Sequence, residues 1–226
     1  MNIPSFPALI QRFFTEWLVG QRGVSSHTVA NYRDSFRLLL RFAAERLNRR
    51  PSNLDLEVID ACFVRDFLCH IESDRGNSIR TRNNRLSALH AFFRYVAINE
   101  PAYALHCQQV LAIPAKRYQR ASVEFLTEEE TVALVAAPDT DTWLGRRDHA
   151  ILLLAVQTGL RNSEITSLRR QDVELGAGAH VRCLGKGRKT RCTPLRPDVA
   201  SVLKQWLGRN PILWLACRPF FGQYVR

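Results

Sequence analysis

The stretch TGLRNSEITSLRRQDVEL (Thr158–Leu175) places a charged side chain where an apolar helix is expected to give way to a loop. The residues before it, HAILLLAVQTG (His149–Gly159), form an apolar run that ends at a glycine, as helices commonly do. Arg161 follows almost at once, Glu164 lies three residues later, and the apolar spacing of a helix then resumes. The pattern predicts two successive helices with Arg161 and Glu164 at their junction.

A second segment that could take part in catalysis is RCLGKGRKTRCTPL (Arg182–Leu195), whose pattern predicts a β-hairpin. Gly185 and Gly187 flank Lys186 and favour a tight turn. A lysine at a hairpin tip can reach into a DNA groove. Because it is ionisable, it could also act as a general acid toward a leaving oxygen, which an arginine would do poorly. Taken alone, the hairpin is explained equally well as an exposed turn with solubilising charge.

The net charge of the chain points to a polyanionic partner. Its 226 residues hold 32 Lys and Arg against 21 Asp and Glu, a formal net charge of +11, and both halves share the excess. A basic balance of this size favours nucleic acid as the partner. A GC-rich genome would also favour arginine over lysine, but it would not produce the excess over acidic residues.

Composition argues against several classes of protein. Hydrophobic residues make up 46% of the chain, an ordinary value, and no run approaches the roughly 20 apolar residues that span a bilayer. The N-terminus has no basic region before a long apolar core, so no signal peptide is expected and the protein is predicted to be cytoplasmic. None of the six cysteines forms a C-x-x-C pair, which argues against a zinc site.

Four helices are predicted in the first half of the chain. Their ranges are Phe6–Val19, a helix from Ser25 or Ser26 to about Leu47, Asp60–Glu72, and a helix that Ser78 caps and that continues to Ile98. Arginines recur along the second and fourth helices, and acidic partners four residues away are scarce. Such arginines usually form a solvated face, but the threonine and asparagine among them suit phosphates and base edges.

A basic linker is expected between two folded parts. Residues from about Pro101 to Val123 lack sustained apolar periodicity. The expected organisation is a domain over residues 1–108, a linker over 109–123 and a second domain over 124–226.

The second part is predicted to mix helices with the hairpin. Thr127 and Glu130 have the spacing of a capping box, and the apolar helix and the Arg161 junction follow. The hairpin comes next, and Pro197 begins a last helix.

The order of these motifs resembles the tyrosine-type site-specific recombinases, the phage integrase family. TGLRNSEITSLRRQDVEL followed by LGKGRKTRCTPL is similar to that family's catalytic domain. The segments GVSSHTVANYRDSFRLLLRFA and IRTRNNRLSALHAFFRYVA are similar to its N-terminal core-binding domain. The resemblance covers roughly residues 6–207. It implies a mainly α fold: a SAM-like four-helix core-binding domain, then part of a mixed α/β integrase-type catalytic domain with a small β-hairpin.

The resemblance also implies an activity and roles for three residues. Such enzymes cut a DNA strand with a tyrosine hydroxyl, form a 3′-phosphotyrosyl bond and rejoin the strand, with no nucleotide cofactor and no metal. Arg161 matches the arginine that clamps the scissile phosphate, a role that suits a bidentate guanidinium. Glu164 matches the acidic residue that supports the site, and Lys186 matches the lysine that protonates the leaving 5′-oxygen.

Double-stranded DNA is the expected partner, with intact recombinase protomers as a further one; neither a membrane nor a small-molecule substrate is expected. The residues expected to contact DNA are Arg33, Arg37, Arg80, Arg82, Asn83, Arg85, Lys116, Arg117, Arg188 and Lys189.

The sequence departs from the family's pattern after the hairpin. The family continues with a His-x-x-Arg motif and a nucleophilic tyrosine, whereas none of the six histidines here has arginine three residues later. Tyr224 lacks the flanking pattern, and the segment 210–226 reads as an unpaired apolar tail. We therefore expect a C-terminally truncated recombinase that is catalytically incomplete. The alternatives are a non-catalytic DNA-binding regulator that competes with an intact recombinase, and an unrelated helical protein that binds RNA.

Overall fold

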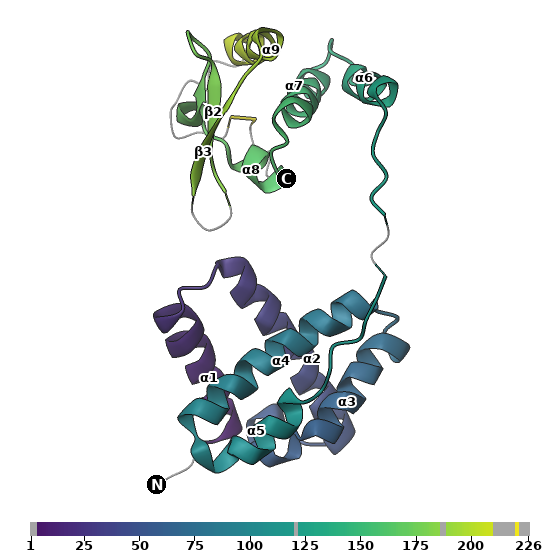
Figure 1. The fold of residues 1–226 in the computed structure, drawn as a ribbon, viewed down its shortest axis with the longest axis vertical. Helices are drawn as coiled ribbons and strands as arrows, with labels where there is room; N and C mark the ends of the chain where they lie inside the picture. Colours follow the sequence, from purple (N-terminus) through teal and green to yellow (C-terminus); the bar gives the residue numbers. More distant parts are fainter. Residues whose placement is uncertain (1–3, 120–121, 186–188, 210–219, 222–226) are drawn as a thin grey trace. The chain divides into compact units, whose positions relative to one another are not determined.

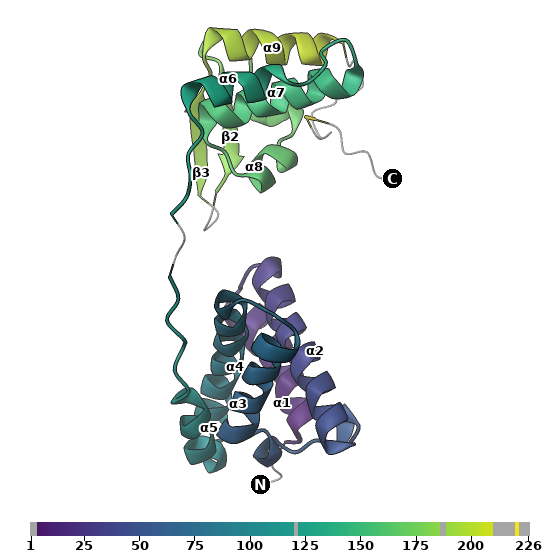
Figure 2. The ribbon, with the colours of Figure 1, turned by 90° about the vertical axis from the view of Figure 1, so that its right-hand side faces the viewer.

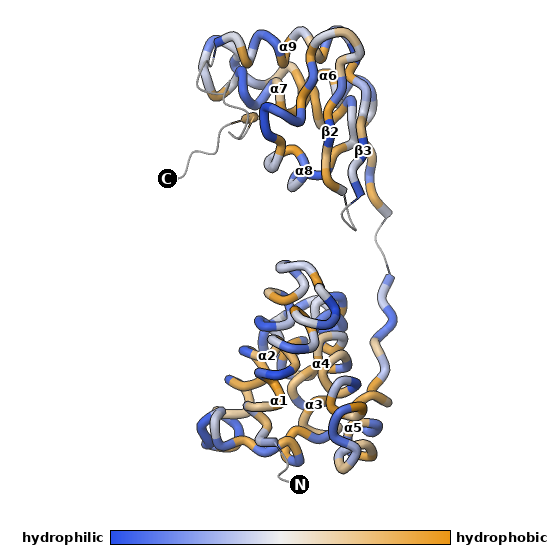
Figure 3. The backbone as a smooth tube through the Cα atoms, turned by 90° about the vertical axis from the view of Figure 1, so that its left-hand side faces the viewer, coloured by the Kyte–Doolittle hydropathy of each residue, from blue (hydrophilic) through white to orange (hydrophobic). Residues whose placement is uncertain are grey.

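The chain folds into two compact units, each with its own hydrophobic core. The computed structural model describes residues 4–119, 122–185, 189–209 and 220–221. The units are residues 1–121 and 122–226 (Figure 1). Along the helices of both units, hydrophobic residues alternate with hydrophilic ones (Figure 3), which is how a helix with one buried face reads in sequence.

The elements described in the first unit are all helical. Its main helices are α1 (Phe6–Arg12), which continues into the π-helical η1 (Phe13–Gln21), α2 (Ser26–Leu47), α3 (Ala61–Cys69), α4 (Ile79–Asn99) and α5 (Ala104–Leu111). Shorter helical turns are η2 (Pro51–Asn53), η3 (Leu56–Val58), η4 (His70–Asp74) and η5 (Pro101–Tyr103). The four helices predicted from the sequence are therefore confirmed.

Serine caps set the starts of the two longest helices. The Ser25 hydroxyl accepts a hydrogen bond from the Thr28 backbone N–H at 3.3 Å, and Ser78 does the same for Thr81 at 3.2 Å. Each bond satisfies one of the free N–H groups at a helix start. The predicted caps of α2 and α4 are thus confirmed.

An aromatic cluster joins α1 and η1 to α2 and α4. The Phe13 ring lies 5.5 Å from that of Phe92, 6.1 Å from Phe36 and 5.6 Å from Tyr95, measured between centroids. All four rings are buried, and the Phe13–Phe92 pair is edge-to-face, an arrangement that aromatic quadrupoles favour. This packing fixes α2 beside α4.

One helix of this unit lies where the sequence predicted a linker. α5 begins four residues after Glu100 and extends to Leu111, past the expected linker start at residue 109. Cys107 and Val110, three residues apart, are fully buried. A helix of eight residues holds too few apolar repeats for periodicity to reveal it, which is why the prediction was wrong there.

The described residues of the second unit form helices and a small sheet. Its elements are α6 (Glu128–Ala136), α7 (Trp143–Thr158), α8 (Asn162–Ser167), η6 (Arg170–Asp172), β1 (Val173–Glu174), β2 (His180–Leu184), β3 (Thr190–Pro194) and α9 (Pro197–Gly208). The strands are antiparallel in the order β1-β2-β3, with Cys183 opposite Arg191. The predicted hairpin, the mainly α fold class and the capping box at Thr127 are confirmed; strand β1 was not predicted.

The core of this unit lies between the helices and the sheet. α7 and α9 pack side by side (Figure 2), and Leu154, Val181 and Leu203 are fully buried. Phe220 and Phe221 join this core: the Phe220 N–H donates to the Leu168 carbonyl at 2.8 Å. For these two residues the prediction of an unpaired apolar tail was wrong; the rest of that tail lies outside the described residues.

In the part of the chain that the structure describes, no helix is both long and apolar enough to cross a bilayer. Within the same residues, no three His, Cys, Asp or Glu side chains gather where a metal ion could be held.

Candidate functional site

Gly159 explains the break between α7 and the charged residues that follow. It adopts the left-handed conformation, with φ 61° and ψ 23°, and its N–H donates to the Ala155 carbonyl at 2.9 Å. Glycine reaches this region without the strain that a Cβ brings. Leu160 then turns into the core, and Arg161 becomes the residue that starts α8. The chain reversal thus brings Arg161 to the surface at a helix start.

Glu164 holds Arg161 by two hydrogen bonds. Its Oε2 accepts the Arg161 backbone N–H at 2.8 Å, and its Oε1 accepts Arg161 Nη1 at 3.2 Å. The glutamate side chain is 5% exposed, whereas the arginine side chain is 61% exposed. The carboxylate is therefore a buried anchor, and the guanidinium keeps donors for a ligand in solvent.

A second arginine, Arg191 on β3, binds the same carboxylate. Its Nη2 lies 2.9 Å from Glu164 Oε2, and its side chain is 43% exposed. Arg191 is directly opposite the buried Cys183, and residues opposite each other in an antiparallel pair point to the same face. The sequence prediction missed Arg191; its only signal was an arginine placed opposite an inward-facing position of the hairpin.

This environment keeps Glu164 ionised. The hydrogen bond from the Arg161 backbone N–H lowers the pKa of the Glu164 carboxyl below its ordinary value. Burial opposes that shift, and the charges of Arg191 and Arg161 add to it. Two cations share one anion here, so the cluster carries a net positive charge that an anionic ligand would meet.

The hairpin turn begins beside this cluster. The Gly185 N–H donates to the Lys189 carbonyl at 2.8 Å, and a Cβ at Gly185 would lie 3.7 Å from Glu164 Oε1. The position just before Lys186 is therefore next to the glutamate. Lys186 and Arg188 themselves lie outside the described residues, and Lys189 is exposed.

The first unit carries a polar groove between α2 and α4, near the starts of both helices. It has a volume of about 370 Å³, and its lining residues are Thr28, Asn31, Tyr32, Ser35, Thr81, Asn84, Arg85 and Ser87. Arg85 Nη1 donates to the Asn31 carbonyl at 3.2 Å and to Ser35 Oγ at 3.1 Å. Hydroxyl, amide and guanidinium groups at helix N-termini are suited to phosphate and base edges.

Comparison with known proteins assigns the chain to a family. The family model for the phage integrase family matches residues 124–217, and that for the phage integrase N-terminal SAM-like domain matches residues 10–99. The integrase/recombinase y4rD of Sinorhizobium fredii is 40% identical over 94% of this chain and 76% of its own length. The chain belongs to the phage integrase family of tyrosine recombinases.

Other integrase-family relatives are longer than this chain. The integrase/recombinase y4rC of Sinorhizobium fredii is 53% identical over 203 residues, and the chain spans 61% of that protein. The tyrosine recombinase XerC of Rhodospirillum centenum is 36% identical, and the chain spans 57% of it.

Solved structures of recombinases share the fold. The lambda integrase dimer bound to a COC′ core site matches with a TM-score of 0.61 at 20% identity, over 91% of this chain and 70% of that one. The XerH site-specific recombinase bound to a palindromic difH substrate matches with a TM-score of 0.59 at 23% identity, over 84% of this chain and 55% of that one. At these identities the similarity concerns the fold alone.

The integrase-family assignment makes the placement of the expected DNA contacts relevant. Five of these side chains are exposed and have no ion pair within the described ranges: Arg33, Arg37, Arg80, Arg117 and Lys189. Arg33 and Arg37 border an apolar groove with Phe14 and Phe36, on a face of α2 other than the one that lines the polar groove. Arg33 and Arg37 therefore lie beside a different groove from the one that Arg85 lines.

Three further expected contacts make hydrogen bonds or ion pairs with other residues of the first unit. Arg82 is 7% exposed, and its Nε lies 3.7 Å from Glu72. The Asn83 amide pairs with the Lys116 backbone in both directions, at 2.7 and 3.0 Å, while Lys116 Nζ lies 2.8 Å from Glu72. These contacts fasten the chain at residue 116 to α4; DNA contact by the three side chains stays a prediction.

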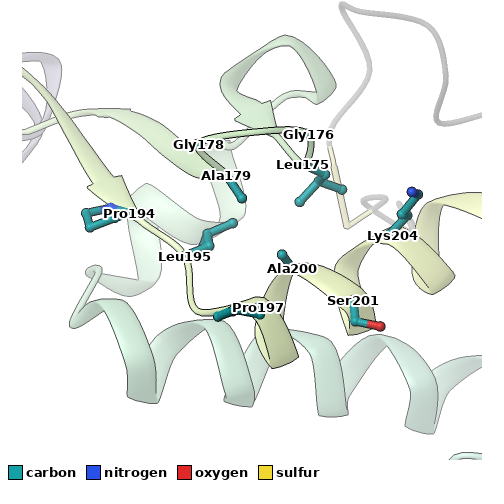
Figure 4. Close-up of a pocket in the computed structure, with 10 residues that line it drawn as sticks. All are labelled: Leu175, Gly176, Gly178, Ala179, Pro194, Leu195, Pro197, Ala200, Ser201 and Lys204. Atoms are coloured by element: carbon teal, nitrogen blue, oxygen red, sulfur yellow. The ribbon is translucent and has the colours of Figure 1, made fainter.

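The second unit also contains a cavity unrelated to the arginine cluster. It has a volume of about 660 Å³ between the β1–β2 turn, the end of β3 and the start of α9. Small and apolar side chains line it, with Lys204 at one side (Figure 4). None of the candidate residues borders it.

Proposed function

We propose that this chain binds duplex DNA and holds a phosphate of the strand at Arg161, as part of a tyrosine recombinase that acts in DNA recombination and integration. The observation that carries the proposal is the exposed Arg161 guanidinium anchored on the buried Glu164 carboxylate. In this proposal Glu164 orients Arg161, and Lys186 is the general acid for the leaving oxygen. Because the chain spans 61% of y4rC, the activity of the whole relatives is part of the proposal.

The two units have different roles in this proposal. The first is a core-binding domain that grips the duplex with the polar groove of α2 and α4, helped by Arg80, Arg85 and Arg117. The second is the catalytic portion, with Arg161, Glu164 and the hairpin. The solved complexes of XerH with difH and of lambda integrase with its core site support DNA as the partner.

Strand cleavage needs groups that these 226 residues do not supply. No histidine is followed by arginine three residues later, and Tyr224 lacks the family's flanking pattern. We therefore propose that the chain binds DNA but forms no covalent adduct on its own, with an intact recombinase protomer as a further partner. A suicide substrate that trapped this chain covalently would contradict this part.

DNA binding is tested by fluorescence anisotropy over a range of salt concentrations. Wild-type protein should prefer duplex DNA to structured RNA of equal length. Arg161→Ala should weaken binding and reduce the slope of log affinity against log salt by about one, as expected for one lost phosphate contact. Arg182→Ala is the matched control, because Arg182 is exposed on β2 opposite Cys192 and makes no ion pair among the described residues. An unchanged slope for Arg161→Ala would contradict the proposal.

A further inference from the structure

We propose that Arg191 is a positioning residue that keeps Arg161 available to the DNA phosphate by sharing the Glu164 carboxylate; this inference rests on the proposed function. Arg191 lies 30 residues from Arg161 in the sequence, and Glu164 joins the two. Neither the family comparisons nor the sequence patterns assign it a role.

The charges of the three side chains do not cancel. Glu164 is 5% exposed and lies at hydrogen-bond distance from two guanidinium groups. With both arginines present, the cluster has a net charge of +1. Without Arg191, Glu164 and Arg161 would cancel, and a phosphate would meet a neutral pair. Arg191 therefore restores the attraction that Glu164 would otherwise remove.

The two carboxylate oxygens of Glu164 have different partners. Glu164 Oε2 accepts both the Arg161 backbone N–H and Arg191 Nη2, while Oε1 accepts Arg161 Nη1 alone. If Arg191 left, Oε2 would attract the Arg161 guanidinium as well, turning its donors inward. Arg191 thus limits how many Arg161 donors the glutamate occupies.

The space beside Gly185 matches this arrangement. A Cβ at Gly185 would meet both Glu164 Oε1 at 3.7 Å and Arg191 Nη1 at 4.0 Å. The hairpin backbone, the carboxylate and the guanidinium are therefore in contact range of one another. Arg191 thus joins β3 to Glu164 on α8.

The test is a set of variants measured for duplex-DNA affinity at fixed low salt, each with a thermal unfolding curve. Arg191→Met removes the charge and keeps an unbranched side chain of partly similar length. We expect it to weaken binding about tenfold, the scale of one charge-assisted hydrogen bond. Arg191→Lys keeps the charge and should retain most of the affinity. Arg182→Met, on the opposite face of the same hairpin, is the matched control for loss of one positive charge.

The decisive variant is Arg191→Met combined with Glu164→Gln. Glutamine can still accept the Arg161 N–H but carries no charge, so the double variant should recover most of the affinity lost in Arg191→Met. If it stays as weak as the single variant, Arg191 either contacts DNA itself or only stabilises the fold, and the inference is wrong. If Arg161→Ala binds like wild type, the proposed function fails instead, whatever Arg191→Met does.

Discussion

At the scale of single residues, the Glu164 carboxylate accepts hydrogen bonds from two arginines while its side chain is 5% exposed. Two consequences follow from this one residue. It fixes the direction of the Arg161 guanidinium, and it makes the stability of the second unit depend on its ionisation. The second consequence can be measured without DNA.

Glu164→Gln should change how thermal stability depends on pH. The folded-state pKa of Glu164 lies below its ordinary value of 4.5, so its stabilising contribution is complete above that value and is lost as pH falls through the folded pKa. Wild-type protein should therefore be more stable than Glu164→Gln at neutral pH, and the difference should shrink on acidification. Differential scanning calorimetry at a series of pH values measures this.

The control for that experiment is Glu124→Gln. Glu124 is exposed and has no hydrogen bond among the described residues, so its variant should follow the wild type at every pH. A difference between Glu164→Gln and wild type that stayed constant down to about pH 3, below the usual glutamate range, would show that the ionised carboxylate contributes nothing.

At the scale of elements, the start of α7 depends on close contact with the loop before it. Thr142 caps α7 by accepting the Gly145 N–H at 3.0 Å, and Gly145 lies against the backbone of Asp139. A Cβ at Gly145 would overlap the Asp139 carbonyl. The loop and the helix start therefore form one packed turn that tolerates no side chain at this position.

Gly145→Ala should lower the free energy of unfolding of the second unit by about 2 kcal/mol, because the backbone must move to admit the methyl group. Urea unfolding followed by tryptophan fluorescence measures this, since Trp143 and Trp206 both lie in that unit. Gly208→Ala is the matched control: a Cβ there meets nothing within 4 Å, so the change should be within about 0.5 kcal/mol.

Elements that begin with a local signal were predictable from the sequence. Ser25 and Ser78 stand directly before apolar periodicity, and the Thr127 capping box spans four residues, so short-range chemistry specifies these starts. α5 has no side-chain cap, and β1 has two residues, so neither offers such a signal.

The residues of the candidate site also divide into those that a local sequence pattern predicts and those that it does not. Arg161 and Glu164 are three residues apart on one helix start, and a sequence pattern can pair them. The contact of Arg191 with Glu164 depends on the register of the β2–β3 hairpin and on where α8 packs, neither of which is local. The burial of Arg82 and its ion pair with Glu72 were likewise not predictable from a local pattern, because Glu72 lies ten residues away on η4.

At the scale of the whole molecule, the two units hold separate hydrophobic cores. We therefore expect two thermal transitions. Leu89→Ala should lower the unfolding temperature of the first unit alone, and Leu203→Ala that of the second alone, each losing about 3 kcal/mol from a fully buried leucine. Calorimetry measures both. If either substitution shifted both transitions equally, the units would share one cooperative fold.

The pairing of Asn83 with the Lys116 backbone sets the point at which the chain leaves the first unit. Because that pairing fastens the chain to α4 at residue 116, the connection between the units is counted from Arg117 to Leu126 and not from the end of α5. Ten residues reach at most about 35 Å when fully extended. The Asn83 amide on α4 thus decides how many residues of chain connect the two units, and a substitution that broke this pairing would lengthen that connection.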